Sequence, residues 1–309
     1  MDLLRSLVFV PGNRRDMLEK AASFPADFLV PDMEDSVPLS EKAAARNVVA
    51  DMLPILYKAG KRMVVRINAL DTGLLEEDMN AALTPHTYGI NVGKVDTPWH
   101  VHEIDKILTA LENKKGLERG RTRLIVYLES ALSVINAYPI CSASPRIMAA
   151  AFGAEDFTVD MGTQRTDKSS EVFLPRAMVA IAAIASNVVP LDIVYSNFRD
   201  EDGLRQDIRV GKSLGYKGKF AIHPSQVQSI NEMFSPLPEE VEYAKRVVWK
   251  NRQVRIFTGG ENDPICRGVF AVNCTGFRTD DLKWSSAMIQ QRIQPVERQV
   301  GTDRSRIIV

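Results

Sequence analysis

The sequence predicts a TIM (β/α)8 barrel with a C-terminal helical extension, and three observations lead to this fold class. Short apolar, β-branched runs alternate with amphipathic helical segments through most of the chain. Eight such units in about 235 residues match the size of the barrel. Runs such as Leu124–Leu128 are apolar throughout, as strands buried on both faces are. A doubly wound sheet is the alternative, but no GxGxxG motif follows any expected strand.

Each expected unit pairs a strand with the helix that follows it. Asn13 is a good N-cap for the first helix, in which Met17, Leu18 and Ala21 have helical spacing. Gly215 ends the seventh helix. The expected pairs are Leu7–Val10 with the helix after Asn13, Phe28–Val30 with Glu41–Leu56, Met63–Ile67 with a weak helix Leu74–Leu83, Tyr88–Val92 with Trp99–Leu111, Leu124–Leu128 with Ala131–Ala137, Ile147–Phe152 with a long polar loop and then Leu174–Ala185, Asp192–Tyr195 with Glu201–Leu214, and Phe220–Ile222 with Ser225–Phe234.

A second region is expected after the barrel. We place the barrel domain at residues 1–235 and a C-terminal extension at residues 236–309. A helix is expected over Glu239–Trp249, whereas the sequence from Gln253 onward has weak periodicity.

Composition excludes several classes of partner. Lys and Arg together number 39, as do Asp and Glu, so no global field attracts nucleic acid or a membrane. The three cysteines have no CxxC or CxxH spacing, which favours reduced thiols over a disulfide or zinc site. The apolar run at the start is too short for a signal peptide or a membrane span, so we expect a cytoplasmic protein.

Polar residues follow directly after the expected strands. In a barrel they would all project at the C-terminal mouth, where active sites of this fold lie. The set consists of Pro11–Arg14, Asp32–Asp35, Arg66–Asn68, Lys94, Glu129–Ser130, Glu155–Asp156, Ser196–Asn197 and His223–Pro224.

Two carboxylates of this set are candidate metal ligands. Glu129 and Asp156 follow adjacent strands and could share one Mg²⁺, which takes one or two carboxylates and leaves places for substrate and water. Glu155 is assigned a supporting role, because neighbouring side chains of an extended segment point in opposite directions. The alternative is a pair of salt bridges to barrel lysines or arginines.

Other candidates suit anionic groups, and the acids Asp32–Asp35 could orient Arg66, bind metal-bound waters, or both. Arg66 presents a planar fork for a carboxylate or oxyanion, or pairs with the acidic cluster Asp32–Asp35, and the two readings are compatible. We take Arg66, Glu34 and Asp35 as candidate catalytic residues. Lys94 could act electrostatically or form a structural ion pair. Gly12–Arg15 could present backbone N–H groups and a cation to a phosphate at a helix start, although the motif alone is weak.

As an ordered set these segments resemble the citrate lyase β-subunit family of the HpcH/HpaI aldolase superfamily, which includes malyl-CoA and citramalyl-CoA lyases. The stretches that carry the resemblance are Arg5–Asn13, Asp32–Val37, Arg66–Asn68, Gly93–Val95, Glu129–Ala131, Phe152–Phe157 with Asp160, and Gly218–Pro224 with Gln226-Val227.

The resemblance implies a TIM barrel in trimers or hexamers, with Mg²⁺ held by Glu129 and Asp156. It implies that Arg66 contacts the oxo-acid part of the substrate, and that the segment with Pro11, Asn13 and Arg14 holds the arm of a CoA or acyl-carrier thioester. Lys94 is a further substrate-binding candidate. The expected reaction is Mg²⁺-dependent cleavage of a 3-hydroxyacyl thioester of the citryl, malyl or citramalyl type to an acetyl thioester and a 2-oxo acid.

The tail departs from the family pattern. A lid segment with a DGxM(V/I)DxP pattern is usual, and Val254–Val309 lacks it; Asp263 or Asp281 could replace its aspartate, but no spacing supports either. Two alternatives therefore stand beside the thioester lyase: a metal-dependent aldolase acting on a free hydroxy-oxo acid, and a non-catalytic homologue that binds a CoA ester.

Overall fold

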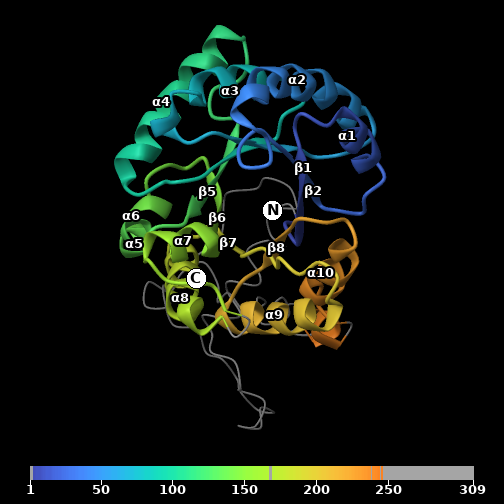
Figure 1. Ribbon diagram of the computed structural model, residues 1–309, viewed down its shortest axis with the longest axis vertical. Helices are drawn as coiled ribbons and strands as arrows, with labels where there is room; N and C mark the ends of the chain where they lie inside the picture. Colours follow the sequence, from blue (N-terminus) through green and yellow to red (C-terminus); the bar gives the residue numbers. More distant parts are fainter. Residues whose placement is uncertain (1–2, 167–168, 238, 244, 246–309) are drawn as a thin grey trace, which may run out of the picture. The chain divides into compact units, whose positions relative to one another are not determined.

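Eight parallel strands close into a barrel in chain order, with β8 paired to β1 (Figure 1). The computed structural model describes residues 3–166, 169–237, 239–243 and 245. The strands are β1 Ser6–Pro11, β2 Phe28–Asp32, β3 Val64–Ile67, β4 Gly89–Val92, β5 Arg123–Leu128, β6 Ile147–Phe152, β7 Val189–Asp192 and β8 Gly218–Ala221. The predicted barrel is confirmed.

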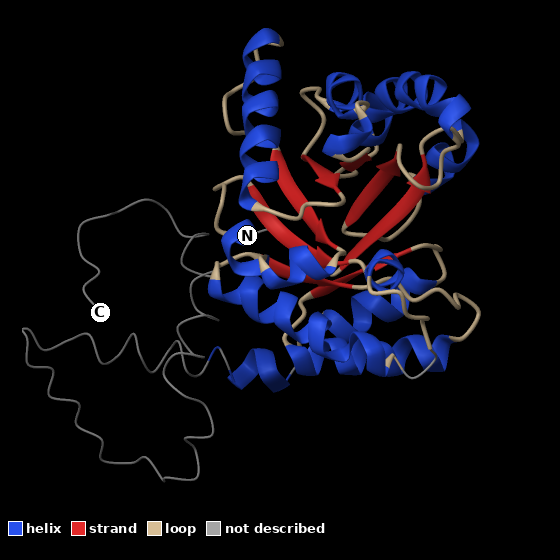
Figure 2. Ribbon diagram, turned by 60° about the vertical axis from the view of Figure 1, so that its left-hand side comes forward, coloured by secondary structure: helices blue, strands red, loops and turns tan. Residues whose placement is uncertain are grey.

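Helices surround the strands on the outside (Figures 1 and 2). They are α1 Arg15–Ala21, α2 Lys42–Lys58, α3 Leu75–Ala82, α4 Pro98–Lys114, α5 Ala131–Ile135, α6 Ala137–Cys141, α7 Ala154–Asp160, α8 Ser170–Ala185, α9 Glu201–Leu214 and α10 Gln226–Phe234, with 3₁₀ turns η1 Leu39–Glu41 and η2 Leu70–Thr72.

Alternation along the strands divides the buried side chains into two cores. Phe28, Val30, Ile125, Tyr127 and Phe220 belong to a smaller cluster inside the barrel. The residues between them on the same strands pack against the helices in a larger outer cluster. Successive side chains of a strand point to opposite faces, so inward-pointing residues alternate with outward-pointing ones. An inward-pointing residue at or just past the carboxyl end of a strand therefore lies at the mouth of the barrel.

Several local expectations are wrong. The N-cap of α1 is Arg14 rather than Asn13, whose side-chain amide instead donates to Glu41. The seventh strand ends at Asp192 instead of beginning there. It contains Pro190, whose carbonyl accepts from the Lys217 N–H at 3.0 Å, so this proline loses only a donor and does not break the strand.

The third wrong expectation concerns the segment after β6. It forms α7, a short helix within the stretch expected to be a polar loop. Asn136 also divides the expected helix Ala131–Ala137 into α5 and α6.

Contacts within the chain separate Leu3–Ser235 from a second unit that comprises Met1–Asp2 and Pro236–Val309. Nearly all of the second unit, including the tail with Asp263 and Asp281, lies outside the described residues, and the boundary predicted at residue 235 stays a prediction. Cys141 is buried and free. Among the described helices, none is long and apolar enough to cross a membrane.

Candidate active site

Arg66 and Asp32 form the firmest pair at the mouth of the barrel. They are partners in the register between β2 and β3, and Arg66 donates from Nε and Nη2 to the two carboxylate oxygens of Asp32 at 2.7 and 2.6 Å. The Asp32 side chain is fully buried. Although burial by itself raises the pKa of Asp32, the charge and hydrogen bonds of Arg66 bring it below its ordinary value. The pair therefore fixes the guanidinium in one orientation.

The segment after β2 supplies two more acids to the same guanidinium. Arg66 Nη1 lies 3.2 Å from Glu34 and 3.0 Å from Asp35. Glu34 is mostly buried, whereas the Asp35 side chain is largely exposed. Lys42, which the sequence interpretation did not single out, donates to the backbone carbonyls of Met33 and Glu34 at 2.8 and 2.7 Å. A buried ammonium thus holds the acidic segment in place.

Glu129 continues the inner row of β5 and lies beside the ends of β4 and β6. Its Oε1 accepts a hydrogen bond from the backbone N–H of Lys94 at 2.7 Å. Two glycines leave room for it: a Cβ on Gly93 would lie 2.5 Å from Glu129 Oε1 and 3.3 Å from Glu34 Oε1, and a Cβ on Gly153 would lie 2.6 Å from Glu129 Oε2. The carboxylate therefore occupies space that larger residues would fill.

Both glutamates have pKa values far above the usual range. Burial, followed by the negative charges of Glu34 and Asp156, raises the pKa of Glu129 to about 8. Burial also raises the pKa of Glu34 to about 7, although Arg66 acts in the opposite direction. The negative charges of Glu34 and Asp156 thus both oppose ionisation of the buried Glu129 carboxyl, an effect that a bound cation would relieve.

Asp156 comes from α7, where it stands in the exposed first turn of the helix. Glu155 points to a different partner, Arg165, at 3.3 Å. The prediction that Glu155 and Asp156 belong to an extended segment is wrong, because the segment is helical. It is the electrostatic effect of Asp156 on Glu129 that links this residue to the cluster.

The donor set fits a hard divalent cation. Glu129 and Asp156 supply carboxylate oxygens, and Mg²⁺ needs only one or two of these beside substrate and water. Within the described part of the chain, no group of three or more His, Cys, Asp and Glu side chains could hold a metal on its own. Any ion bound here would accordingly take part of its coordination from other oxygens.

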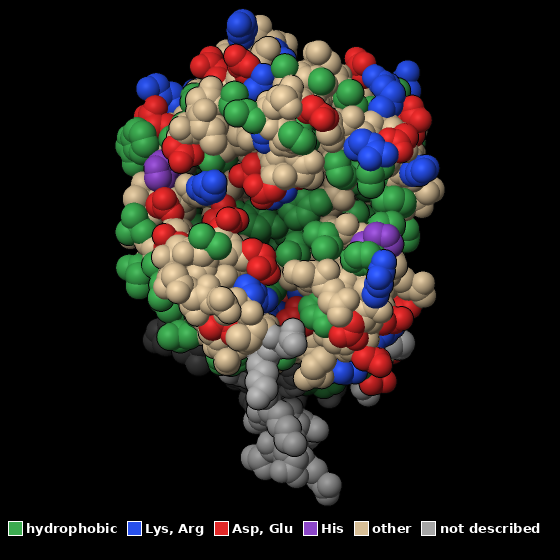
Figure 3. Space-filling model, in the orientation of Figure 1, with side chains coloured by type: hydrophobic (Ala, Val, Ile, Leu, Met, Phe, Trp, Pro, Cys, Tyr) green, Lys and Arg blue, Asp and Glu red, His purple; other side chains and the backbone are tan. Residues whose placement is uncertain are grey.

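Three aromatic side chains inside the barrel, Phe9, Tyr127 and Phe220, pack beneath the charged residues of the mouth, and we call them the aromatic floor. Phe9 stacks on Phe220 with ring centroids 5.0 Å apart, and Tyr127 lies 5.1 Å from Phe220. The Arg66 guanidinium lies over the Phe9 ring at 4.4 Å. A space-filling view shows a hollow with hydrophobic side chains inside it and acidic ones around it (Figure 3). The floor excludes water beneath the charged groups and so strengthens their interactions.

Tyr127 is a residue of this site that no sequence signal revealed. Its hydroxyl is buried and has no hydrogen-bond partner among the described residues. Burial raises its pKa well above the ordinary value, so the hydroxyl keeps its proton.

The predicted thioester segment folds as a turn beside this cluster. Pro11 ends β1 opposite Asp32, and its carbonyl accepts from the Arg14 N–H at 3.1 Å. The side-chain hydrogen bonds of Asn13 and Arg14 go to Glu41 and Asp16.

The remaining polar residues at the strand ends lie in separate environments. Lys94 presents an exposed side chain, and its φ of 53° is in the left-handed region. Asn68 bonds to Met33 and Asp78 and is structural in character. His223 bonds to Ser225 and stacks on Phe198, with ring centroids 4.6 Å apart.

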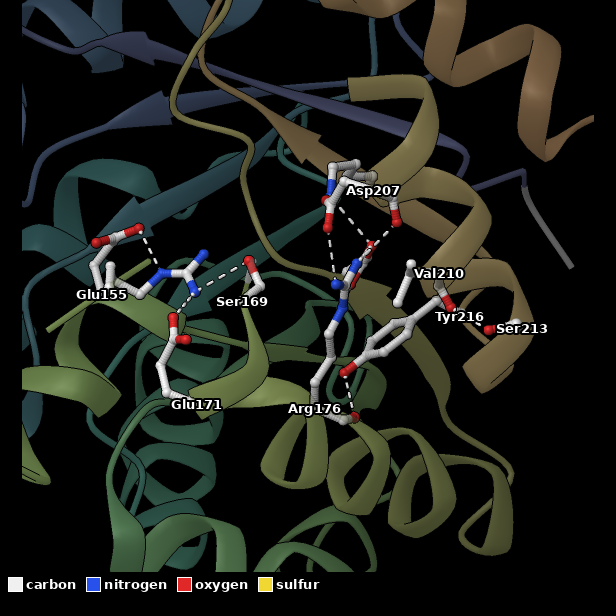
Figure 4. A network of polar contacts seen from close by, with 11 residues as sticks. Glu155, Ser169, Glu171, Arg176, Asp207, Val210, Ser213 and Tyr216 are labelled. Atoms are coloured by element: carbon white, nitrogen blue, oxygen red, sulfur yellow. Dashed lines mark hydrogen bonds and ion pairs between the residues drawn. The ribbon is translucent and has the colours of Figure 1, made fainter. Parts of the chain in front are cut away.

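A second charged network lies on the outside of the barrel and positions helices (Figure 4). Arg176 of α8 donates to both carboxylate oxygens of Asp192 at 2.8 and 2.6 Å and to Asp207 of α9 at 2.8 Å. Lys219 of β8 bonds to the same two aspartates. Two positive and two negative side chains balance, so the network ties α8 and α9 to β7 and β8 without a net buried charge.

Comparison with known proteins gives consistent results. A family model described as HpcH/HpaI aldolase/citrate lyase matches residues 5–224. The citrate lyase subunit beta of Leuconostoc mesenteroides subsp. cremoris is 35% identical over 246 residues, which are 80% of this chain and 82% of that protein. The mitochondrial citramalyl-CoA lyase of Rattus norvegicus is 30% identical over 255 residues, which are 79% of this chain and 75% of that protein.

A solved structure extends the comparison to the fold. The citrate lyase beta subunit of M. tuberculosis, complexed with oxaloacetate and magnesium, superposes with a TM-score of 0.64 at 25% identity. The match covers 76% of this chain and 98% of that one. The predicted resemblance is confirmed, as is the prediction of an enzyme. The protein belongs to the HpcH/HpaI aldolase/citrate lyase family and is a lyase of that family.

Proposed function

We propose that this chain cleaves a 3-hydroxyacyl thioester of the citryl, malyl or citramalyl type into an acetyl thioester and a 2-oxo acid, and that it requires Mg²⁺. The observation that carries the proposal is the buried Glu129 carboxylate, whose pKa is raised by burial and by Glu34 and Asp156 while Arg66 lies fixed nearby. The names of the relatives support the thioester, and the magnesium complex of the solved neighbour supports the metal.

Glu129 and Asp156 would hold the metal. Bound there, Mg²⁺ would supply a Lewis acid for the hydroxyl and carboxylate oxygens of the substrate. Arg66, oriented by Asp32, would offset the negative charge of the oxo-acid fragment. The aromatic floor of Phe9, Tyr127 and Phe220 would keep water away from the reacting carbon atoms.

The chemical step needs one proton acceptor. A base takes the proton of the substrate hydroxyl, the carbon–carbon bond breaks, and its electron pair moves to the carbon next to the thioester carbonyl. Protonation of that carbon gives the acetyl thioester, and the former hydroxyl carbon becomes the ketone of the 2-oxo acid. Glu34 and Asp35 are our candidates for this proton transfer, because the Arg66 guanidinium that would bind the oxo-acid fragment lies 3.2 and 3.0 Å from them and so places both beside that fragment.

The thioester arm would pass the turn at Pro11–Arg15. Asn13 and Arg14 stand at this turn, and Lys94 presents an exposed cation at the end of β4. These groups suit the phosphates of CoA or of a carrier-protein arm.

The test is turnover of citryl-, malyl- and citramalyl-CoA by the full chain, with Mg²⁺ or with EDTA. Glu129→Gln should lower kcat/KM by about a thousandfold or more, since it removes a charged ligand. Glu76→Gln, at an exposed position of α3, is the matched control and should be neutral. Turnover that stays at the wild-type, Mg²⁺-supplied level both with EDTA and in Glu129→Gln would contradict the proposal.

A related aldolase acting on a free hydroxy-oxo acid would need the same metal and arginine. Calorimetry with acetyl-CoA distinguishes the two, because only a thioester lyase has a reason to bind it. Heat of binding together with thioester turnover supports our proposal, whereas turnover of the free acid without acetyl-CoA binding supports the aldolase.

A further inference from the structure

The Tyr127 hydroxyl is a buried polar group inside the barrel that has no hydrogen-bond partner among the described residues. Tyr127 is 8% exposed and directly precedes Glu129 in the inner row of β5. A buried hydroxyl without a partner is unfavourable, because it has lost its bonds to water and gained none in return. Phenylalanine would fill the same space without this penalty. The hydroxyl therefore indicates a function other than packing.

The surroundings of Tyr127 place its hydroxyl near the charged residues of the mouth. Burial raises its pKa, and the charges that act on it are first that of Arg66 and then those of Glu129 and Glu34. The two rings that pack against Tyr127 belong to phenylalanines, which offer its hydroxyl no strong acceptor. The hydroxyl thus lies in the electric field of the site, and the aromatic floor leaves its hydrogen-bonding capacity unused.

The side-chain donors at the mouth are largely committed to the protein's own acceptors. Arg66 donates to both carboxylate oxygens of Asp32 and lies within 3.2 Å of two further carboxylates. A guanidinium has five N–H groups, so little of it remains for the carboxylate of a substrate. Lys42 donates to main-chain carbonyls. A site that takes an anionic oxo-acid fragment therefore needs a further donor, and Tyr127 supplies a neutral one.

Small residues flank Tyr127 and Glu129 on the neighbouring strands. Tyr127 pairs with Ala151 of β6, and the register between β4 and β5 puts Gly93 on its other side. A Cβ on Gly93 or on Gly153 would overlap the Glu129 carboxylate, so backbone alone flanks this carboxylate there. A shift of the Glu129 side chain when a ligand binds, which is a common kind of change, would uncover the hydroxyl beneath it.

We propose that the Tyr127 hydroxyl donates a hydrogen bond to the carboxylate of the oxo-acid half of the substrate. This inference rests on the proposed function, since it needs a substrate that carries a carboxylate beside Arg66. Arg66 would attract this carboxylate by its charge, and Tyr127 would fix its orientation from below. The hydroxyl acts as a neutral donor throughout, so its protonation state does not change.

An internal water molecule is the alternative partner for this hydroxyl. Asn91 of β4 is fully buried, and its Oδ1 also has no partner among the described residues. Asn91 pairs with Ile125, which precedes Tyr127 in the inner row of β5. A water bonded to both groups would make the hydroxyl part of the fold, whereas a bond to substrate makes it part of the site. The two cases differ in what the ligand-free chain loses with the hydroxyl.

The test compares Tyr127→Phe with Tyr216→Phe in the full chain. Tyr216 is the matched control, because it is 2% exposed but its hydroxyl donates to the Arg176 carbonyl at 2.8 Å (Figure 4). Calorimetry with pyruvate, glyoxylate and oxaloacetate in the presence of Mg²⁺ measures binding, and the urea midpoint measures stability. Tyr127→Phe should weaken binding about tenfold or more and leave the midpoint of the ligand-free chain at or above that of wild type. Tyr216→Phe should lower the midpoint and leave binding unchanged.

Kinetics of the thioester reaction give a further readout. The carboxylate is common to citryl-, malyl- and citramalyl-CoA, so Tyr127→Phe should lower kcat/KM for each of them by a similar factor. Unchanged 2-oxo acid affinity in Tyr127→Phe would overturn the inference, as would a loss confined to one thioester or a urea midpoint as low as that of Tyr216→Phe. A wild-type chain that binds the 2-oxo acids but cleaves no thioester would contradict the proposed function alone, and one that binds none would contradict both.

Discussion

Glu129 Oε1 accepts its hydrogen bond from a backbone N–H, that of Lys94, at 2.7 Å. The donor is available because Lys94 adopts a φ of 53°, a conformation that glycine adopts at little cost and lysine does not. The end of β4 is thus shaped so that its main chain, rather than a side chain, orients the carboxylate at the end of β5. The lysine side chain itself is exposed and takes no part in this hydrogen bond.

This relationship predicts that Lys94→Gly keeps the metal site. The N–H remains, so the Mg²⁺ affinity of Lys94→Gly and of Lys94→Ala should stay within about twofold of wild type by calorimetry. Lys94→Gly should also be more stable than Lys94→Ala by about 1 kcal/mol in urea unfolding, because alanine retains the strain. Loss of Mg²⁺ binding in both variants would mean that the lysine charge, and not its N–H, sustains the site.

A second prediction concerns the space between the two glutamates. The Cβ of Gly93→Ala would lie 2.5 Å from Glu129 Oε1 and must displace the carboxylate. We expect Mg²⁺ affinity and kcat/KM to fall by about 10–100-fold, the usual effect of disturbing a ligand's surroundings. Gly73→Ala is the control: its Cβ meets nothing within 4 Å, but its φ is 72°, so it should cost stability and leave the kinetics alone. Equal kinetic effects in the two variants would refute the steric explanation.

Much of the barrel followed from local patterns, and the exceptions have physical causes. Runs such as Leu124–Leu128 are apolar on both faces because a barrel strand packs inward and outward at once. The seventh strand was misplaced because Pro190 lies inside it. The pairing of Pro190 with Ala150 of β6 and the hydrogen bond from the Lys217 N–H to the Pro190 carbonyl show that the strand continues through the proline. The short helix α7 was missed because it spans only seven residues and its N-cap is Gly153, which offers no side-chain cap.

Part of the candidate site could also be predicted from local sequence patterns. Parallel strands bring their carboxyl ends together, so Arg66 and the acids after β2 were expected as neighbours, and they are. The hydrogen bond from the Lys94 N–H to Glu129 depends on the φ angle of Lys94, and a lysine at this position does not predict that angle. The unpartnered Tyr127 hydroxyl depends on the packing of aromatic rings inside the barrel, and this too is a property of the tertiary structure.

Burial decides how much each acid contributes to holding Arg66, which gives a third prediction. Asp32 is fully buried and bonds to the guanidinium twice, whereas Asp35 is 65% exposed and bonds once. Asp32→Asn should lower the free energy of unfolding by about 3–5 kcal/mol, as breaking a buried pair does. Asp35→Asn, the matched control, should lower it by less than about 1 kcal/mol. Similar urea midpoints for the two variants would contradict this ranking.

The fourth prediction uses a buried pair far from the mouth. Glu112 of α4 accepts two hydrogen bonds from Arg146 at 2.8 Å and one each from the N–H groups of Gly120 and Thr122. Burial opposes ionisation, but these bonds outweigh it and lower the pKa of Glu112 from 4.5 to about 2. A carboxylate whose pKa is lower in the folded chain stabilises it above pH 4.5 and loses that effect as pH falls toward 2.

Glu112→Gln should therefore lower the free energy of unfolding by about 3 kcal/mol at pH 7, and the difference from wild type should shrink between pH 4.5 and pH 2. Urea unfolding at several pH values measures this difference directly. Glu103→Gln on the same helix is the control, because the Glu103 carboxylate lies 3.5 Å from an exposed lysine and should contribute little at any pH. A loss in Glu112→Gln that stays constant down to pH 3 would show that the amide disturbs packing, and that the ionised state of Glu112 is not the source of the stability.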